Sequence, residues 1–81
     1  MIVQVQLFAV AKELGGRSVV AVELREGATL AELRQALADE LPQLAALLPR
    51  MRIAVGGDYA DDRVVIPPNA DVACIPPVSG G

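Results

Sequence analysis

Apolar and polar residues alternate in two stretches near the start of the chain. Residues 3–7 read VQVQL, and residues 17–24 resume the same two-residue period. This period is typical of strands with one buried face, and the short distance between the stretches indicates a hairpin. The residues expected to face the core are Val3, Val5, Leu7, Val20, Val22 and Leu24.

Between these strands, residues 9–16 predict a turn or a short helical piece that Gly15 and Gly16 end. A longer helix follows the second strand. Thr29 lies three residues before Glu32, which is the spacing of a capping box at a helix start. Leucines then recur at helical intervals until Pro42, so one stripe of this helix should pack on the sheet.

The second half of the chain predicts three more strands. Residues 50–58 contain a third strand that runs into a Gly-Gly turn, RVVI at 63–66 is a short fourth, and DVACI at 71–75 is the fifth. Within residues 56–62, GGDYADD is read as a hairpin turn, and Asn69 marks another turn. Residues 43–48 could add a second short helical turn.

This order of elements predicts an α+β fold with one main helix across one face of a mixed sheet of about five strands. It fits a β-grasp, or ubiquitin-like, arrangement in which the last strand lies parallel to the first. A split ferredoxin-like sheet would require a second long helix, so the β-grasp is preferred. We expect a domain over residues 1–77 and a flexible extended tail over residues 78–81.

The composition excludes many catalytic sites. Hydrophobic residues make up 53% of 81 residues, but Phe8 and Tyr59 are the only aromatic ones, so the core should be aliphatic. The chain has no histidine and one cysteine, Cys74, which leaves no plausible zinc site and no Ser-His-Asp triad. Because Cys74 lies in an apolar strand, we expect a buried core residue and not a reactive thiol.

The charge and the hydropathy pattern bear on partners and location. A net charge of −3 and scattered basic residues argue against nucleic acid as a ligand and favour basic partner surfaces. No apolar run approaches the ~20 residues of a membrane span, and no signal sequence is visible. A cytoplasmic protein is expected, which agrees with a single cysteine.

The end of the sequence, PPVSGG, suggests a tail made to enter another protein. Pro76 and Pro77 cannot donate to a strand ladder, so pairing should stop at about Ile75. The residues expected to insert are Val78, Ser79, Gly80 and Gly81, because glycine lets a backbone pass through a narrow channel. The alternative is that chain ends are commonly small and polar, so that a terminal Gly-Gly alone means little.

Three segments together resemble one family. LFAVAKELGG, ATLAELRQAL and above all DVACIPPVSGG are similar to the small subunits of molybdopterin synthase, which are ubiquitin-like sulfur carriers. The resemblance covers essentially the whole chain. It implies that an E1-like enzyme uses ATP to adenylate the Gly81 carboxylate, and that a persulfide donor converts it to a thiocarboxylate.

The same resemblance implies the partners and assigns the chemistry to them. The tail would enter the large synthase subunit, in a heterotetramer, and donate sulfur to a pterin precursor during molybdenum cofactor synthesis. The catalytic groups would lie on that subunit, so whether this chain counts as an enzyme is left open. It would bind no cofactor or metal itself, and Lys12 falls where similar proteins carry a basic residue near the interface.

Two residues near the start of the expected tail stand out because they alternate with inward-facing strand residues. Phe8 and Ile75 follow the inward-facing Leu7 and Cys74, so both should lie on the uncovered face, where they could seat a partner. The alternative is that a loop covers them. The expected partner-binding residues are Phe8, Ile75, Lys12, Pro76 and Pro77.

Three functions remain open at this point. The chain could carry sulfur for molybdopterin, or carry sulfur for another product such as thiamine or a thiolated tRNA base. It could also be a ubiquitin-like modifier joined through Gly81 to lysines, or an unconjugated interaction module.

Overall fold

The computed structural model describes residues 1–77. Its elements follow the order strand, helix, strand, helix, two short 3-10 turns and three strands. They are β1 (Ile2–Leu7), α1 (Ala9–Gly15), β2 (Val19–Glu23), α2 (Leu30–Glu40), η1 (Pro42–Leu44), η2 (Leu48–Arg50), β3 (Arg52–Val55), β4 (Asp58–Ala60) and β5 (Val72–Ile75).

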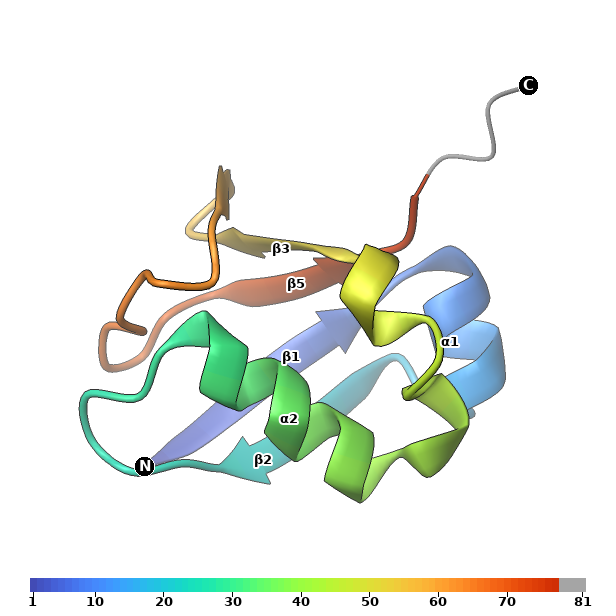
Figure 1. The fold of residues 1–81 in the computed structure, drawn as a ribbon, viewed down its shortest axis with the longest axis horizontal. Helices are drawn as coiled ribbons and strands as arrows, with labels where there is room; N and C mark the ends of the chain where they lie inside the picture. The colour runs from blue at the N-terminus through green and yellow to red at the C-terminus, as the bar shows by residue number, and fades with distance from the viewer. Residues whose placement is uncertain (78–81) are drawn as a thin grey trace.

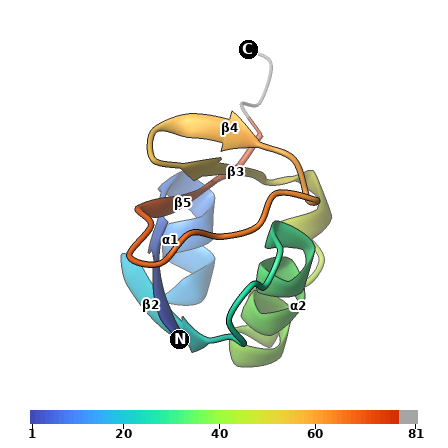
Figure 2. The ribbon, with the colours of Figure 1, turned by 90° about the vertical axis from the view of Figure 1, so that its left-hand side faces the viewer.

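The five strands form one mixed sheet in the order β2-β1-β5-β3-β4. β5 pairs parallel with β1, with Leu7 opposite Cys74, and antiparallel with β3, with Ile75 opposite Arg52. The last strand is therefore central, and α2 crosses one face of the sheet (Figures 1 and 2). This confirms the predicted β-grasp, including the parallel first and last strands and the end of pairing at Ile75.

The core lies between the sheet and α2. The leucines of α2 that were predicted to face the sheet, Leu30, Leu33 and Leu37, are all 0% exposed. The inward residues of β1 and β2 are buried as well, and Phe8 and Tyr59 stay outside, so the core is aliphatic as expected. No polar or charged residue among the described ones is buried.

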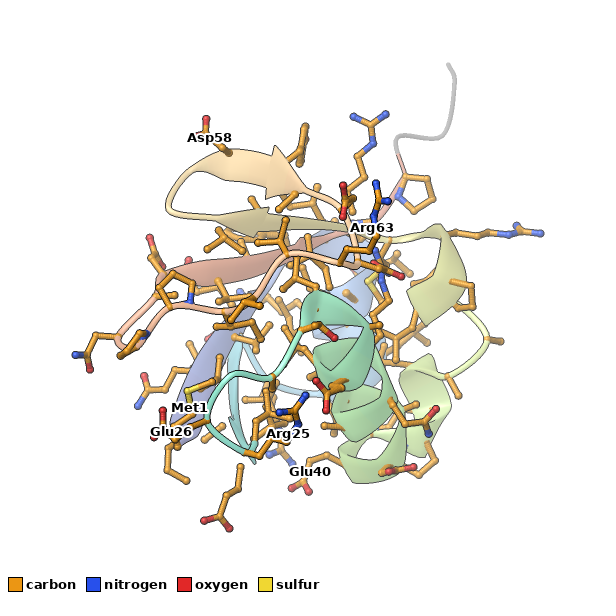
Figure 3. The ribbon with its side chains drawn as sticks, turned by 60° about the vertical axis from the view of Figure 1, so that its left-hand side comes forward. Met1, Arg25, Glu26, Glu40, Asp58 and Arg63 are labelled. Carbon is orange, nitrogen blue, oxygen red and sulfur yellow. The ribbon has the colours of Figure 1, made fainter. Side chains whose placement is uncertain are left out.

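The start of α2 is held by the predicted capping box. The backbone N–H of Thr29 donates to Glu32 Oε2 at 2.8 Å, and the backbone N–H of Glu32 donates to Thr29 Oγ1 at 3.4 Å. Arg25 adds a two-pronged ion pair, with Nε 2.7 Å from Glu32 Oε1 and Nη2 2.9 Å from Oε2. Its guanidinium lies beside the first turn of the helix (Figure 3). Local sequence therefore fixes this helix start.

The same contacts predict an acid-sensitive contribution to stability. The Arg25 hydrogen bonds, followed by the Thr29 amide, lower the pKa of Glu32 from 4.5 to about 2. A carboxyl with a lowered folded-state pKa stabilises the fold above its unfolded pKa, so this contribution should be lost as the pH falls from about 4.5 towards 2. NMR titration of the Glu32 carboxyl carbon should give the low midpoint, and Glu32→Gln should flatten this part of the stability profile. A Glu32 midpoint close to 4.5 would contradict the prediction.

One predicted strand was wrong. The fourth strand is Asp58–Ala60, not residues 63–66. Gly56 and Gly57 have φ of 61° and 89°, the positive pair that a two-residue hairpin turn requires, so pairing resumes at once with Val55 opposite Asp58. GGDYADD is therefore a two-residue turn followed directly by a strand.

Residues 61–66 instead cover the start of α2. Carbonyl oxygens of Val64 and Asp62 accept from the backbone N–H groups of Leu30 and Ala31 at 3.0 and 3.1 Å. Arg34 adds a salt bridge from α2, with Nε 2.8 Å from Asp62 Oδ1. Within the described part of the chain, the only β-type bridge of this segment joins Thr29 and Val65. This segment therefore caps α2, because its carbonyl groups accept hydrogen bonds from the free amide groups at the start of the helix.

The short helix predicted after β1 is present as α1 and packs closely. Gly16 caps it in the left-handed region, with φ 74°. Gly15 lies against the core, where a Cβ would stand 3.0 Å from Leu7 Cδ1 and 3.5 Å from Leu41 Cδ1. A residue without a side chain therefore allows α1 to approach the end of β1.

Candidate functional site

The expected tail begins after Ile75, the last residue of the central strand β5. We call this point the tail root, and it lies in the middle of one end of the sheet. β5 ends at Ile75 between the last residue of β1 and the first residue of β3 (Figure 1). Pro76 is buried and Pro77 is exposed. A partner could therefore contact Pro77 directly, whereas Pro76 packs into the domain and fixes where the chain leaves it.

The alternation of buried and more exposed residues at this end of the sheet is as predicted. Leu7 and Cys74 are 2% and 0% exposed, whereas Phe8 is 45% exposed and Ile75 is half-buried. Phe8 and Ile75 directly follow two residues that pair across parallel strands, so they lie at the same end of neighbouring strands. An exposed aromatic ring beside a half-buried isoleucine is an apolar surface that a partner could cover.

Sequence reasoning missed Tyr59 as a neighbour of this surface. Tyr59 pairs with Ala54 on β3, is 59% exposed, and its ring lies 4.9 Å below the guanidinium carbon of Arg52. Ala54 also pairs with Ala73 of β5, so two alanines lie between Tyr59 and Gln6 of β1 across the sheet. The Gly-Gly pair was the signal that could have placed Tyr59 in a strand.

A shallow depression brings two predicted partner-binding residues together. Phe8 and Lys12 both line a hollow of about 650 Å³ on the outer side of β1, together with Asn69 and Asp71. Within it, Gln6 Nε2 donates to Asp71 Oδ1 at 3.0 Å, which ties β1 to the segment before β5. Ile75, Pro76 and Pro77 do not line this hollow.

The residue after Phe8 has an unusual backbone conformation. Ala9, the next residue, has φ 51°, a left-handed conformation that costs an alanine more than a glycine. We expect Ala9→Gly to stabilise the protein by about 1 kcal/mol in denaturant unfolding. The matched control is Ala36→Gly in the middle of α2, which should destabilise by about 1 kcal/mol. Two changes of the same sign would contradict this reading.

Cys74 is buried, as the sequence predicted. Its side chain is 0% exposed in the centre of the sheet, and burial raises the pKa of the thiol to about 11. A thiol of this kind stays protonated at neutral pH, and the thiolate is the nucleophilic form. Cys74 is therefore a core residue.

Residues 1–77 contain neither a cluster of metal-ligating side chains nor a helix long and apolar enough to span a membrane. The residues predicted to insert into a partner lie outside the described ones. They are Val78, Ser79, Gly80 and Gly81.

The sequence and the fold both match known proteins. The chain is 33% identical over 81 residues to the molybdopterin synthase sulfur carrier subunit of Caenorhabditis briggsae, covering 98% of this chain and 96% of that protein. Among solved structures it resembles the small archaeal modifier protein SAMP1 from Haloferax volcanii, with a TM-score of 0.88, 25% identity and full coverage of both chains. At 23% identity and a TM-score of 0.70, it shares its fold over the full length of both chains with a chain from the Helicobacter pylori complex of subunits 1 and 2 of molybdopterin-converting factor. The ThiS family model matches residues 5–81. The chain belongs to the ThiS family.

Proposed function

We propose that this protein is the sulfur carrier subunit of a molybdopterin synthase. The observation that carries the proposal is the end-to-end match to a relative of that name at 33% identity. The Gly-Gly ending supports it, because a carrier of this kind presents its terminal carbonyl to another protein's active site.

The proposed chemistry starts at the Gly81 carboxylate. A carboxylate is a poor electrophile at neutral pH, since its negative charge repels nucleophiles and its leaving group would be oxide. ATP converts it to an acyl adenylate with release of pyrophosphate. A persulfide sulfur then displaces AMP, and a thiol cleaves the sulfur–sulfur bond to leave a thiocarboxylate. Division of one difficult substitution into easier steps is the logic of covalent catalysis.

The thiocarboxylate is the cargo. Its sulfur is anionic and nucleophilic at neutral pH, and it would attack a pterin precursor held by the large subunit. We propose that this subunit, an E1-like adenylating enzyme and a persulfide donor are the partners, with two small and two large subunits per synthase. The chain would consume ATP only through its activating partner, would bind no cofactor, and would act in the reducing cytoplasm.

The fold supports this role through the tail root. β5 is held on both sides by β1 and β3, so the chain leaves the domain at a fixed point. Phe8, Ile75, Lys12 and Pro77 are not fully buried and would seat the partner while the tail enters it. Apolar and aromatic anchors with charged neighbours are typical of protein interfaces.

A second candidate function is protein modification. It is favoured by the likeness to the archaeal modifier protein, at 25% identity over the full length of both chains. The same adenylated Gly81 would then be attacked by a lysine amine of a target protein, with loss of AMP and formation of an isopeptide bond. Both functions need the same activation step and differ in the nucleophile that follows it.

Intact mass measurement of the protein purified from its own cells tests the proposal. Replacement of one terminal oxygen by sulfur, located on Gly81 by sequencing the C-terminal peptide, would support a sulfur carrier. An isopeptide bond to lysine would support the modifier instead. An unmodified carboxylate despite plentiful ATP and sulfur donor would overturn both. Accumulation of pterin intermediates in a deletion strain would identify molybdopterin, and not thiamine or a tRNA base, as the product.

A further inference from the structure

The fold places the basic residues that form no salt bridge among the described residues at one end of the sheet. Three arginines, at positions 25, 34 and 63, form salt bridges with acidic side chains. The other four basic residues are exposed and form no salt bridge among the described residues. We call them the basic collar: Lys12, Arg17, Arg50 and Arg52.

The collar flanks the tail root on both sides. On the β3 side, Arg52 pairs with Ile75, the last strand residue before the tail, and Arg50 lies just before it. On the β1 side, Lys12 lies in α1, and Arg17 precedes Ser18, whose carbonyl accepts from the Leu7 amide at 2.8 Å. Because β5 lies between β1 and β3, the four cations surround the point where the chain leaves the sheet.

Three acidic residues outside salt bridges lie at the opposite end, where Glu23 ends β2, Glu26 follows it and Asp58 begins β4. Asp71, which precedes β5, lines the same hollow as Lys12. Figure 3 places Glu26 and Asp58 away from the end of β5. Of the other acidic residues outside salt bridges, Glu13 lies in α1 beside Lys12 and Arg17, and Asp39 and Glu40 end α2, whose next residue, Leu41, lies close to Gly15 of α1.

We propose that the basic collar docks on a rim of acidic side chains around the channel by which a partner protein receives the tail. This rests on the proposed function, since the surface concerned is the one that surrounds the tail. It replaces the basic partner expected from the net charge of −3. A six-residue strand such as β1 is about 20 Å long, twice the ~10 Å screening length at 0.1 M salt, so a docking partner senses mainly the nearer end.

An acidic protein rim fits the collar better than a long polyanion does. The collar residues are single side chains from α1, the α1–β2 turn and the start of β3, placed around a point and not along a line. A nucleic acid would extend past the root and meet the acidic end of the same small domain. A local rim meets the collar without reaching the acidic end of the sheet, and the difference in charge between the two ends turns the carrier tail-first towards it.

Stopped-flow association of the purified carrier with its E1-like activating enzyme tests the proposal. We expect Arg50→Gln/Arg52→Gln to slow association about tenfold at low salt, with little change in dissociation and no difference from the native chain at high salt. The matched control is Glu23→Gln/Asp58→Asn, which changes net charge by the same amount in the other direction and should leave the rate nearly unchanged. Melting temperatures of both variants show whether they are folded.

The possible outcomes separate this inference from the proposed function. Association that the arginine variant leaves unchanged, or that the acidic-end variant slows, would overturn the collar and leave the carrier function standing. No binding by the native chain, or binding without loading of Gly81 in the presence of ATP and sulfur donor, would overturn the carrier function and the collar with it. If the collar variant loses affinity for duplex DNA but associates normally with the enzyme, the collar belongs to a polyanion and the proposal is wrong.

Discussion

Removal of Gly81 is expected to abolish thiocarboxylate formation and complementation of a carrier-deletion strain. The reactive carbonyl would move back by one residue along the tail, about 3.5 Å. Attack on an activated acyl group needs the reacting atoms about 3–3.5 Å apart, so a shift of that size leaves the carbonyl out of reach. The measurement is intact mass after incubation with the activating enzyme, ATP and sulfur donor, together with growth of the complemented strain.

The controls for this prediction concern the fold and the position of the carbonyl. The free energy of unfolding should not change, because the pairing of β5 ends at Ile75 and the described core lies within residues 3–74. An added residue after Gly81 should be as harmful as its removal, whereas Ser79→Ala keeps the length and should retain loading. Full complementation by the chain that lacks Gly81 would contradict the carrier hypothesis.

The regular elements could be predicted because their signals are local. Thr29 and Glu32 form the helix cap within four residues, and the alternation in residues 3–7 sets the buried face of β1. The prediction of the fourth strand was wrong for an equally local reason. The apolar run at 63–66 has the stronger strand pattern, but Gly56 and Gly57 specify a two-residue turn, with pairing of DYA directly after it.

The site could be predicted only where it depends on the alternation of inward- and outward-facing residues along a strand. Phe8 lies outside because Leu7 lies inside, and that follows from a period of two. The ring of Tyr59 beneath Arg52 and the burial of Pro76 depend on strand order and packing. The basic collar depends on them too, since residues 12 and 52 become neighbours of the same root only when β5 inserts between β1 and β3.

Leu7→Ala and Phe8→Ala are expected to have opposite effects although the two residues are adjacent. Leu7 is 2% exposed and lies under α1, where its Cδ1 would be 3.0 Å from a Cβ on Gly15. Its truncation removes buried methyl groups and leaves a cavity, which should cost about 3 kcal/mol of unfolding free energy. A domain of this size has a total of roughly 4–12 kcal/mol, so the melting temperature should fall by more than about 10 °C.

Phe8→Ala should cost less than about 1 kcal/mol of stability, since the ring is 45% exposed to solvent. Its effect should appear in binding instead, where loss of an aromatic anchor at an interface centre weakens affinity for the large subunit by about tenfold or more. Thermal unfolding and calorimetric titration of both variants measure the two effects. Because Phe8 continues the extended backbone of β1, the two side chains point to opposite faces of the sheet. A destabilised Phe8→Ala with unchanged affinity would therefore move Phe8 from the partner surface into the core.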